Sequence, residues 1–276
     1  MGVRKEIIMD VRFGFFPGNK RYALTMSYDD GVVQDRRLVE IFNKYGIKAT
    51  FHLNSGTLGA EKHIAPSEVA TLYEGHEVSC HSLTHPYLEN IPAQEVIYEI
   101  DEDRKNLEAL CSYPVFGMSY PFGTFSEKVK EQASMLGIVY SRTVKSTNKF
   151  FLPENFLEWN PTCHHRENIA EKYQKLKSRS RGMSLLYIWG HAYELDQGIE
   201  NNSWEMIEQF CALAGNDPDI WYATNIEIYE YVTAMRALRF SADRTMVYNP
   251  SAIDVIIEVD GAPFTVPAGK VAHLAV

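Results

Sequence analysis

Two histidines and two aspartates are the residues of this sequence best suited to hold and use a metal ion. His81 and His85 are four positions apart, a spacing that puts both imidazoles on the same side of a helical turn. Hydrolytic sites with two histidines take a carboxylate as third ligand and leave one position open for water. We therefore expect Asp30 to complete the site and the pKa of its bound water to fall towards neutrality.

Asp29 stands directly before this expected ligand. Successive side chains of a strand point to opposite faces, so both carboxylates reach one site only where the chain turns at a strand end. We assign Asp30 to the metal and Asp29 to the base that takes a proton from the metal-bound water. The alternative is that one of the two aspartates caps the following helix.

The elements that must position these residues follow an alternating pattern between about residues 20 and 237. Amphipathic segments with helical spacing separate short runs rich in strand formers. About seven such strand–helix units predict a parallel sheet, which a TIM-like (β/α) barrel closes economically at this length. The expected strands are Tyr22–Tyr28, Ala49–Leu53, Glu77–Cys80, Val115–Ser119, Ile138–Arg142, Ser184–Trp189 and Ile220–Ala223.

Polar clusters follow the ends of four of these strands. They are Asp29-Asp30, His81, Pro121-Phe122 and His191. The carboxyl ends of barrel strands meet on one face, where the active sites of such barrels lie. We therefore expect these clusters to converge, although each one alone could be an ordinary turn or surface position.

The last forty residues have a different pattern. Three short strand-like runs, Met246–Tyr248, Ile253–Val259 and Pro263–Val266, are separated by turn residues. We expect a barrel over residues 1–238 and a small C-terminal β appendage over residues 239–276. One role open to the appendage is the interface of a homo-oligomer.

Composition excludes several classes of protein. The 276 residues carry 36 acidic and 27 basic side chains, a net charge of −9 that argues against a nucleic-acid partner. No apolar run is long enough to span a membrane, so no membrane association is expected. The first residues lack the apolar core of a secretory signal, which favours a cytoplasmic protein unless a leader has been removed. The four cysteines show no CxxC spacing and indicate ordinary buried thiols.

Four motifs, taken in order, resemble those of the polysaccharide deacetylases, carbohydrate esterase family four. The resemblance covers roughly residues 20 to 235 and implies a distorted (β/α)7 barrel that removes N- or O-acetyl groups from sugars with zinc or a similar metal. The motifs are Ser27-Tyr28-Asp29-Asp30-Gly31, His81-Ser82-Leu83-Thr84-His85, Tyr120-Pro121-Phe122-Gly123 and Trp189-Gly190-His191.

The resemblance also implies roles for single residues. Asp29 matches the general base, and His191 matches the general acid that protonates the leaving group. Phe122 stands where the family offers a backbone N–H to the oxyanion, with Tyr120 in the same motif. The metal ligands implied are Asp30, His81 and His85.

Two positions depart from the family pattern. Ser119 stands where the family usually has an arginine that steadies the catalytic aspartate, and the usual acidic partner of the acid histidine is missing from Ser141–Val144. Arg142 could supply the missing guanidinium, or it could be a sheet-edge arginine. Glu194 or Asp196 could orient His191, or either could be a solvated loop charge.

Several other polar and aromatic residues have two interpretations. His164, in Thr162-Cys163-His164-His165, could bind a second metal, contact substrate or be incidental to a loop. Trp189 could pack against a sugar face or belong to the core. His52 and Asn54 could face the same cavity or be packed polar residues.

The sequence thus predicts a metal-dependent hydrolase that removes an acetyl or similar acyl group from an amide or ester of a carbohydrate. Zn²⁺ suits the donor set, which also accepts Fe, Co, Ni or Mn. A rival interpretation is hydrolysis of a non-peptide C–N bond in a small molecule, such as a formamide, cyclic amide or ureide. A catalytically silent sugar-binding protein is less favoured, because binding alone would need neither Asp29 nor His191.

Overall fold

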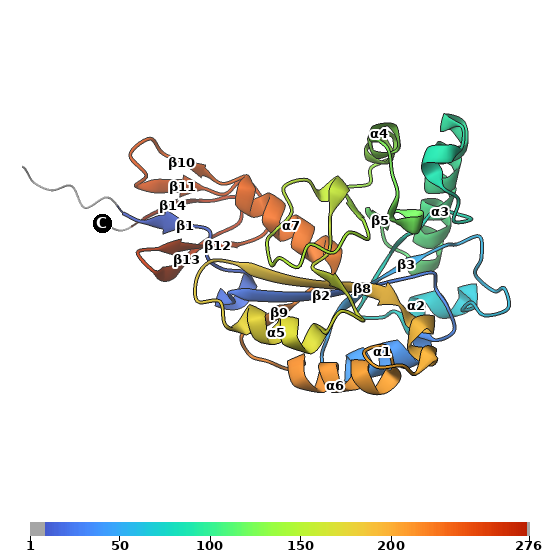
Figure 1. Ribbon diagram of the computed structural model, residues 1–276. Helices are drawn as coiled ribbons and strands as arrows, with labels where there is room; N and C mark the ends of the chain where they lie inside the picture. The colour runs from blue at the N-terminus through green and yellow to red at the C-terminus, as the bar shows by residue number, and fades with distance from the viewer. Residues whose placement is uncertain (1–8, 275–276) are drawn as a thin grey trace, which may run out of the picture.

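A curled sheet of parallel strands forms the centre of the computed structural model, which describes residues 9–274 (Figure 1). Seven strands follow the order β6-β5-β4-β3-β2-β8-β7, and β9 pairs with β2 as an eighth. This topology confirms the distorted (β/α)7 barrel with helices around a parallel sheet. The strands are β2 (Tyr22–Asp29), β3 (Ala49–Leu53), β4 (Glu77–Cys80), β5 (Gly117–Ser119), β6 (Tyr140–Arg142), β7 (Cys163–His164), β8 (Ser184–His191) and β9 (Ile220–Tyr222).

The distortion of the barrel is visible in the pairing of β2. Its whole length pairs with β8, whereas its first half pairs with β9 and its second half with β3. Between the two edge strands, β6 and β7, the sheet of the described residues is closed only by an isolated bridge from Arg142 of β6 to Trp159, which precedes β7. The barrel is therefore continuous through β2 and weakly closed on the opposite side.

All the α-helices of the described residues except the last one cover the outer side of the sheet, and their apolar residues form one core with it. The amphipathic segments expected between the strands form helices, but β7 and α5 lie in a stretch for which no element was predicted. The α-helices are α1 (Asp35–Lys44), α2 (Val69–Leu72), α3 (Ala93–Cys111), α4 (Glu127–Met135), α5 (Ile169–Lys177), α6 (Trp204–Ala214) and α7 (Asn225–Arg236). Short 3-10 helices span Pro17–Asn19, Pro66–Glu68, Leu88–Asn90, Pro121–Gly123, Phe156–Glu158 and Ala192–Gln197.

A second core lies between α7, the inner side of the parallel sheet and two small antiparallel sheets. Figure 1 shows these small sheets beside the ends at which β2 and β8 begin. One has the order β1-β12-β13 and the other β10-β11-β14. Their strands are β1 (Val11–Arg12), β10 (Arg239–Phe240), β11 (Met246–Tyr248), β12 (Val255–Val259), β13 (Ala262–Val266) and β14 (Val271–His273).

The N-terminal strand β1 thus completes a sheet of the C-terminal region, because Val11 pairs with Val259. The division of the chain at residue 238, and a role of the appendage in oligomers, stay predictions. Within residues 9–274, none of the helices has the length and apolar character needed to cross a membrane.

Candidate active site

Along each strand of the parallel sheet, apolar side chains that face outward alternate with polar side chains that face inward. On β2, Leu24, Met26 and Tyr28 pack in the outer core with the helices, so Asp29 at the strand end points inward. The register of the sheet pairs Asp29 with His191 of β8. The other buried inward-facing polar residues are Thr25, Ser27, Thr50, His52, Glu77, Ser79, His81, Ser119, Tyr140, Arg142 and Tyr187.

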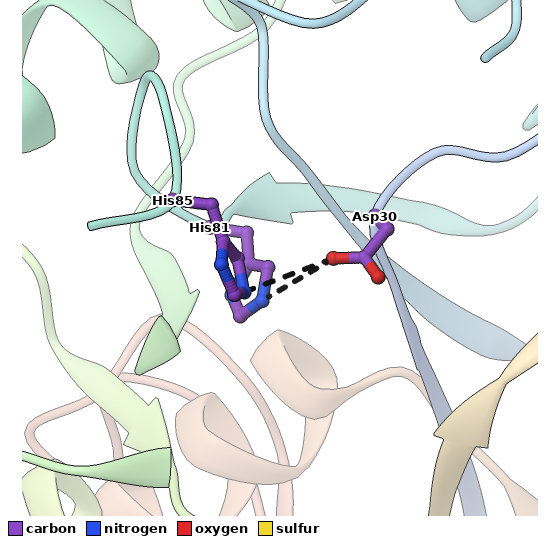
Figure 2. A group of neighbouring side chains, drawn as sticks. All are labelled: Asp30, His81 and His85. Carbon is purple, nitrogen blue, oxygen red and sulfur yellow. Dashed lines mark ion pairs between the residues drawn. The ribbon is translucent and has the colours of Figure 1, made fainter. Parts of the chain in front are cut away.

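Asp30, His81 and His85 come together as one group of possible metal ligands. In Figure 2 both imidazoles point towards the carboxylate of Asp30, whose Oδ1 lies 3.6 Å from His81 Nε2 and 3.9 Å from His85 Nε2. These separations are longer than hydrogen-bond distances. A tetrahedral Zn²⁺ with bonds of about 2.0–2.1 Å holds its ligand atoms about 3.3 Å apart, so the donor set and its spacing fit such an ion.

The backbone explains how consecutive and nearby residues reach this point. Asp30 has a φ of 82°, a left-handed conformation that Asp tolerates better than most residues, so it leaves the direction of β2 and presents its carboxylate beside that of Asp29. The prediction of a helical turn between the two histidines is wrong. Residues 81–85 form an irregular loop in which Ser82 and His85 have positive φ values of 63° and 62°.

Ser119 determines how the ring of His81 is protonated. His81 Nδ1 lies 2.9 Å from the carbonyl oxygen of Ser119 and 2.7 Å from its Oγ. Because a carbonyl only accepts hydrogen bonds, Nδ1 carries the proton and Nε2 offers its lone pair towards Asp30. Burial lowers the pKa of His81, which favours the same neutral form.

The loop of the two histidines is held by α3, a contribution that the sequence analysis missed. Asp103 accepts hydrogen bonds from the backbone N–H of His81 at 3.0 Å and of Ser55 at 2.7 Å. Glu99 accepts from the N–H of Thr84 at 2.8 Å and from its hydroxyl at 2.6 Å. Glu99 and Asp103 both lie on the buried face of α3. Acidic residues on a helix face that is otherwise apolar were the only sign in the sequence that α3 supports the loop.

Asn54 holds the loop from the other side. Its side-chain amide donates to the carbonyl oxygens of His81 at 2.5 Å and Ser82 at 2.8 Å. His52 lies deeper and its Nε2 contacts Ser27 Oγ at 2.9 Å. Burial lowers the pKa of His52 to about 3, so it is a neutral, packed residue of the inner face.

Asp29 is 1% exposed and has two partners besides the histidines. Its Oδ2 pairs with the guanidinium of Arg142, and its Oδ1 accepts from the Ser119 hydroxyl at 3.2 Å. Burial would raise the pKa of Asp29, but the charge of Arg142 outweighs burial and holds this pKa well below its usual range. Asp29 is therefore an ionised carboxylate throughout the neutral pH range.

Arg142 reaches Asp29 from β6, two strands beyond β4. It is fully buried, its Nη1 donates to the carbonyl of Thr143 at 3.1 Å, and its guanidinium stacks 4.5 Å from the centre of the Trp189 ring. Ser119 and Arg142 are paired in the register of β5 and β6. The two residues that flank Asp29 thus stand side by side on neighbouring strands.

His191 lies on the other side of Asp29, with Nε2 4.0 Å from Asp29 Oδ2. Its Nδ1 lies 3.4 Å from Oε2 of Glu194, and the backbone N–H of His191 donates to the same oxygen at 3.3 Å. Burial opposes protonation, but the interaction with Glu194 and the charges of Asp29 and Asp30 raise the pKa of His191. Asp196 instead bonds to Gln34 and Trp204.

His164 joins this group from β7, with Nε2 3.0 Å from Glu194 Oε2. His165 also approaches Glu194, but its ring nitrogens lie 3.2 Å from the Tyr28 hydroxyl and 2.9 Å from Asn202 Oδ1. Cys163 packs in the outer core, where burial raises the pKa of its thiol to about 12. It lies apart from the histidine cluster.

The aromatic residues near the site divide into exposed and buried ones. Phe122 is 45% exposed, stacks on Tyr87 with ring centres 3.7 Å apart and lies 4.5 Å from the ring of His85. Among residues 9–274 its backbone N–H donates no hydrogen bond to the protein. Tyr120 is fully buried, and its hydroxyl donates to the carbonyl of Leu157 at 3.0 Å. Trp189 is 8% exposed and packs against Arg142.

Comparisons with known proteins agree on one family. Residues 17–141 match the family model described as polysaccharide deacetylase. The peptidoglycan-N-acetylglucosamine deacetylase PgdA of Listeria monocytogenes is 30% identical over 125 residues, which cover 45% of this chain and 26% of that protein. The peptidoglycan-N-acetylmuramic acid deacetylase PdaC of Bacillus subtilis is 28% identical over 122 residues, or 43% of this chain and 25% of that protein. The chain thus matches about a quarter of the length of these relatives.

The fold is similar to that of a candidate polysaccharide deacetylase from Mycobacterium smegmatis, whose crystal structure aligns with a TM-score of 0.59 at 15% identity. The alignment covers 80% of this chain and 93% of the other. It supports the barrel architecture and its helices.

Proposed function

The chain belongs to the polysaccharide deacetylase family, and from this premise we propose that it removes an acetyl or similar acyl group from an amide or ester of a carbohydrate with a divalent metal. The observation that carries the proposal is the position of a buried, ionised Asp29 between a possible metal site and His191. A hydrolase needs a base, an electrophile and an acid around one acyl carbon.

Asp30, His81 and His85 would hold the metal, for which Zn²⁺ fits and Fe, Co, Ni or Mn are alternatives. When bound there, the metal polarises the acyl carbonyl and lowers the pKa of a water. The chain contributes the rigidity of the site, because Ser119 orients the ring of His81 and the acids of α3 hold its loop.

Asp29 takes the proton of the attacking water in this mechanism. Its paired partners, Arg142 and Ser119, keep it ionised and oriented. As the water oxygen bonds to the acyl carbon, the N–H of Phe122 donates to the carbonyl oxygen that becomes negative. The bond to the sugar nitrogen or oxygen then breaks, and His191 delivers a proton to that leaving atom.

A sugar suits the surface beside this centre. The stacked pair of Phe122 and Tyr87 presents exposed aromatic surface next to His85, and an apolar sugar face packs well on such rings. The two relatives named above act on N-acetylated units of peptidoglycan, so N-acetylglucosamine and N-acetylmuramic acid units are the first substrates to test.

The decisive experiment replaces Asp29 by Asn and measures acetate release from N-acetylated oligosaccharides by the metal-loaded protein. We expect Asp29→Asn to lose at least about a hundredfold in kcat, the size of a missing general base, while metal analysis still finds the ion. Asp196→Asn is the matched control, because this nearby carboxylate binds Trp204 and Gln34 instead.

Full activity of Asp29→Asn would overturn the assignment of the base. Release of formate or ammonia from small amides, with no acetate from sugars, would support the rival C–N hydrolase. Absence of all these products from the metal-loaded wild-type protein would support a silent sugar-binding protein.

A further inference from the structure

We propose that His164, His191 and Glu194 form a second divalent-cation site beside the first. The three side chains come from β7, from the end of β8 and from the 3-10 helix Ala192–Gln197 that follows it. The residues offer one ligand atom each, and these three atoms all lie within 4.8 Å of one another. Two imidazoles and a carboxylate are the donor types of the first site.

The spacing of the three ligand atoms suits an ion. Glu194 Oε2 lies 3.0 Å from His164 Nε2 and 3.4 Å from His191 Nδ1, close to the separation of about 3.3 Å between ligands of a tetrahedral Zn²⁺. His191 Nδ1 is buried and makes no hydrogen bond within residues 9–274. The Nδ1 of His164 accepts the N–H of Arg166 at 3.3 Å, so the ring proton lies on Nε2. An ion at Nε2 would move that proton to Nδ1 and replace this long contact.

The charge balance around Glu194 also favours a cation. Its side chain is 13% exposed, and within residues 9–274 its ion-pair partners are imidazoles, without a lysine or arginine. A largely buried carboxylate needs a compensating charge, and a cation bound between Glu194 and the two imidazoles would supply it. His165 is not a ligand, because Tyr28 and Asn202 occupy its nitrogens.

Occupation of this site has a consequence for the reaction, which rests on the proposed function. An ion bound at Nδ1 keeps the imidazole of His191 neutral, so its Nε2 loses the acidity needed to protonate a leaving amine. Excess cation should therefore inhibit amide cleavage by about a hundredfold. An aryl acetate, whose leaving group needs no proton, should be inhibited much less.

The experiment loads the metal-free protein with Zn²⁺ by equilibrium dialysis and counts ions per chain. We expect two ions in the wild type, one in Asp30→Asn and one in His164→Gln. His273→Gln is the control, since this exposed histidine lies on β14 of the appendage. Glu194→Gln, expected to hold one ion, repeats the test if His164→Gln fails to fold by near-ultraviolet circular dichroism.

A wild type that saturates at one ion, or a second ion that survives in both His164→Gln and Glu194→Gln, would overturn the proposal. The inhibition of amide and aryl acetate cleavage by excess cation tests the second site separately from the proposed function. Two ions without selective inhibition of amide cleavage would leave the site intact and count against His191 as the acid. If the protein with one ion turns over neither substrate but still binds two ions at excess Zn²⁺, the proposed function would be rejected and the second site would stand.

Discussion

Replacing Arg142 by Met removes the charge that faces Asp29 while keeping most of the side-chain volume. Arg142 is fully buried, pairs with Asp29 and stacks on Trp189. The change therefore leaves a carboxylate that is 1% exposed with the Ser119 hydroxyl and the neighbouring imidazoles as its partners. We expect both catalysis and stability to respond.

The magnitude follows from the partners that remain. Loss of a facing charge within a few ångströms raises the pKa of a carboxyl by about 1 to 3, which corresponds to about 1.4–4 kcal/mol. Breaking a buried ion pair by removing one partner costs about 3–5 kcal/mol of unfolding free energy, a similar size. Because Asp29 acts as a base only when ionised, activity should be lost at a higher pH in Arg142→Met than in the wild type.

The assay is the pH dependence of kcat/KM for acetate release by the metal-loaded enzyme, together with urea unfolding at several pH values. The acid limb should move up by about 1 to 3 pH units. The wild-type pair stabilises the protein above the pKa of unfolded Asp29, and that contribution is lost as pH falls through the lower pKa of the folded state. The deficit of Arg142→Met should accordingly be largest near neutral pH and shrink in acid.

Arg104→Met is the matched control, since this arginine pairs with Glu108 on α3. A folded Arg142→Met protein whose acid limb coincides with that of the wild type would refute the role of Arg142. Arg142→Lys keeps the charge but not the planar guanidinium, so its acid limb should lie between those of the wild type and Arg142→Met.

Three further changes test other parts of the structure. Asp103→Asn weakens the support of the His81 backbone and should lower Zn²⁺ affinity by about tenfold in calorimetric titration, the lower end for residues that hold ligands. Burial raises the pKa of Asp35 to about 8, so between about pH 4 and 8 the Asp35 carboxyl is protonated in the folded state and ionised in the unfolded state. The free energy of unfolding therefore falls as pH rises through this range. Asp35→Asn should reduce that fall by up to about 1.4 kcal/mol per pH unit in urea titrations. Gly190→Ala brings a Cβ within 2.1 Å of the buried ring of His165 and should cost about 1–3 kcal/mol in the same unfolding assay.

Each of these expectations can fail on its own. Unchanged Zn²⁺ affinity in Asp103→Asn would show that the loop keeps its shape without this acid. Parallel pH–stability curves for Asp35→Asn and the wild type would mean that the buried carboxyl titrates near its ordinary pKa. Wild-type stability of Gly190→Ala would require that the His165 ring moves freely, against its two ring contacts.

Several elements were predictable because they depend on local sterics. The apolar runs of β2, β3, β4 and β8 and the helical spacing of α1 and α3 are properties of neighbouring residues. The short β7 was missed because two residues of strand carry no period. The helix α5 did carry a signal that was overlooked, since Ile169, Tyr173 and Leu176 are buried at helical spacing. The loop of His81 and His85 was read as a helical turn because spacing alone does not report backbone φ.

The sequence by itself determined the types, order and strand-end positions of Asp29, Asp30, His81 and His191. Those features are linear, and parallel strands that end in polar residues must bring them to one face. Only the tertiary structure decided which partners they have. Arg142 faces Asp29 from β6, and Glu194 faces His191 with His164 from β7. The curl of the sheet brings Arg142 to Asp29 across 113 residues of sequence, and no local pattern encodes that pairing.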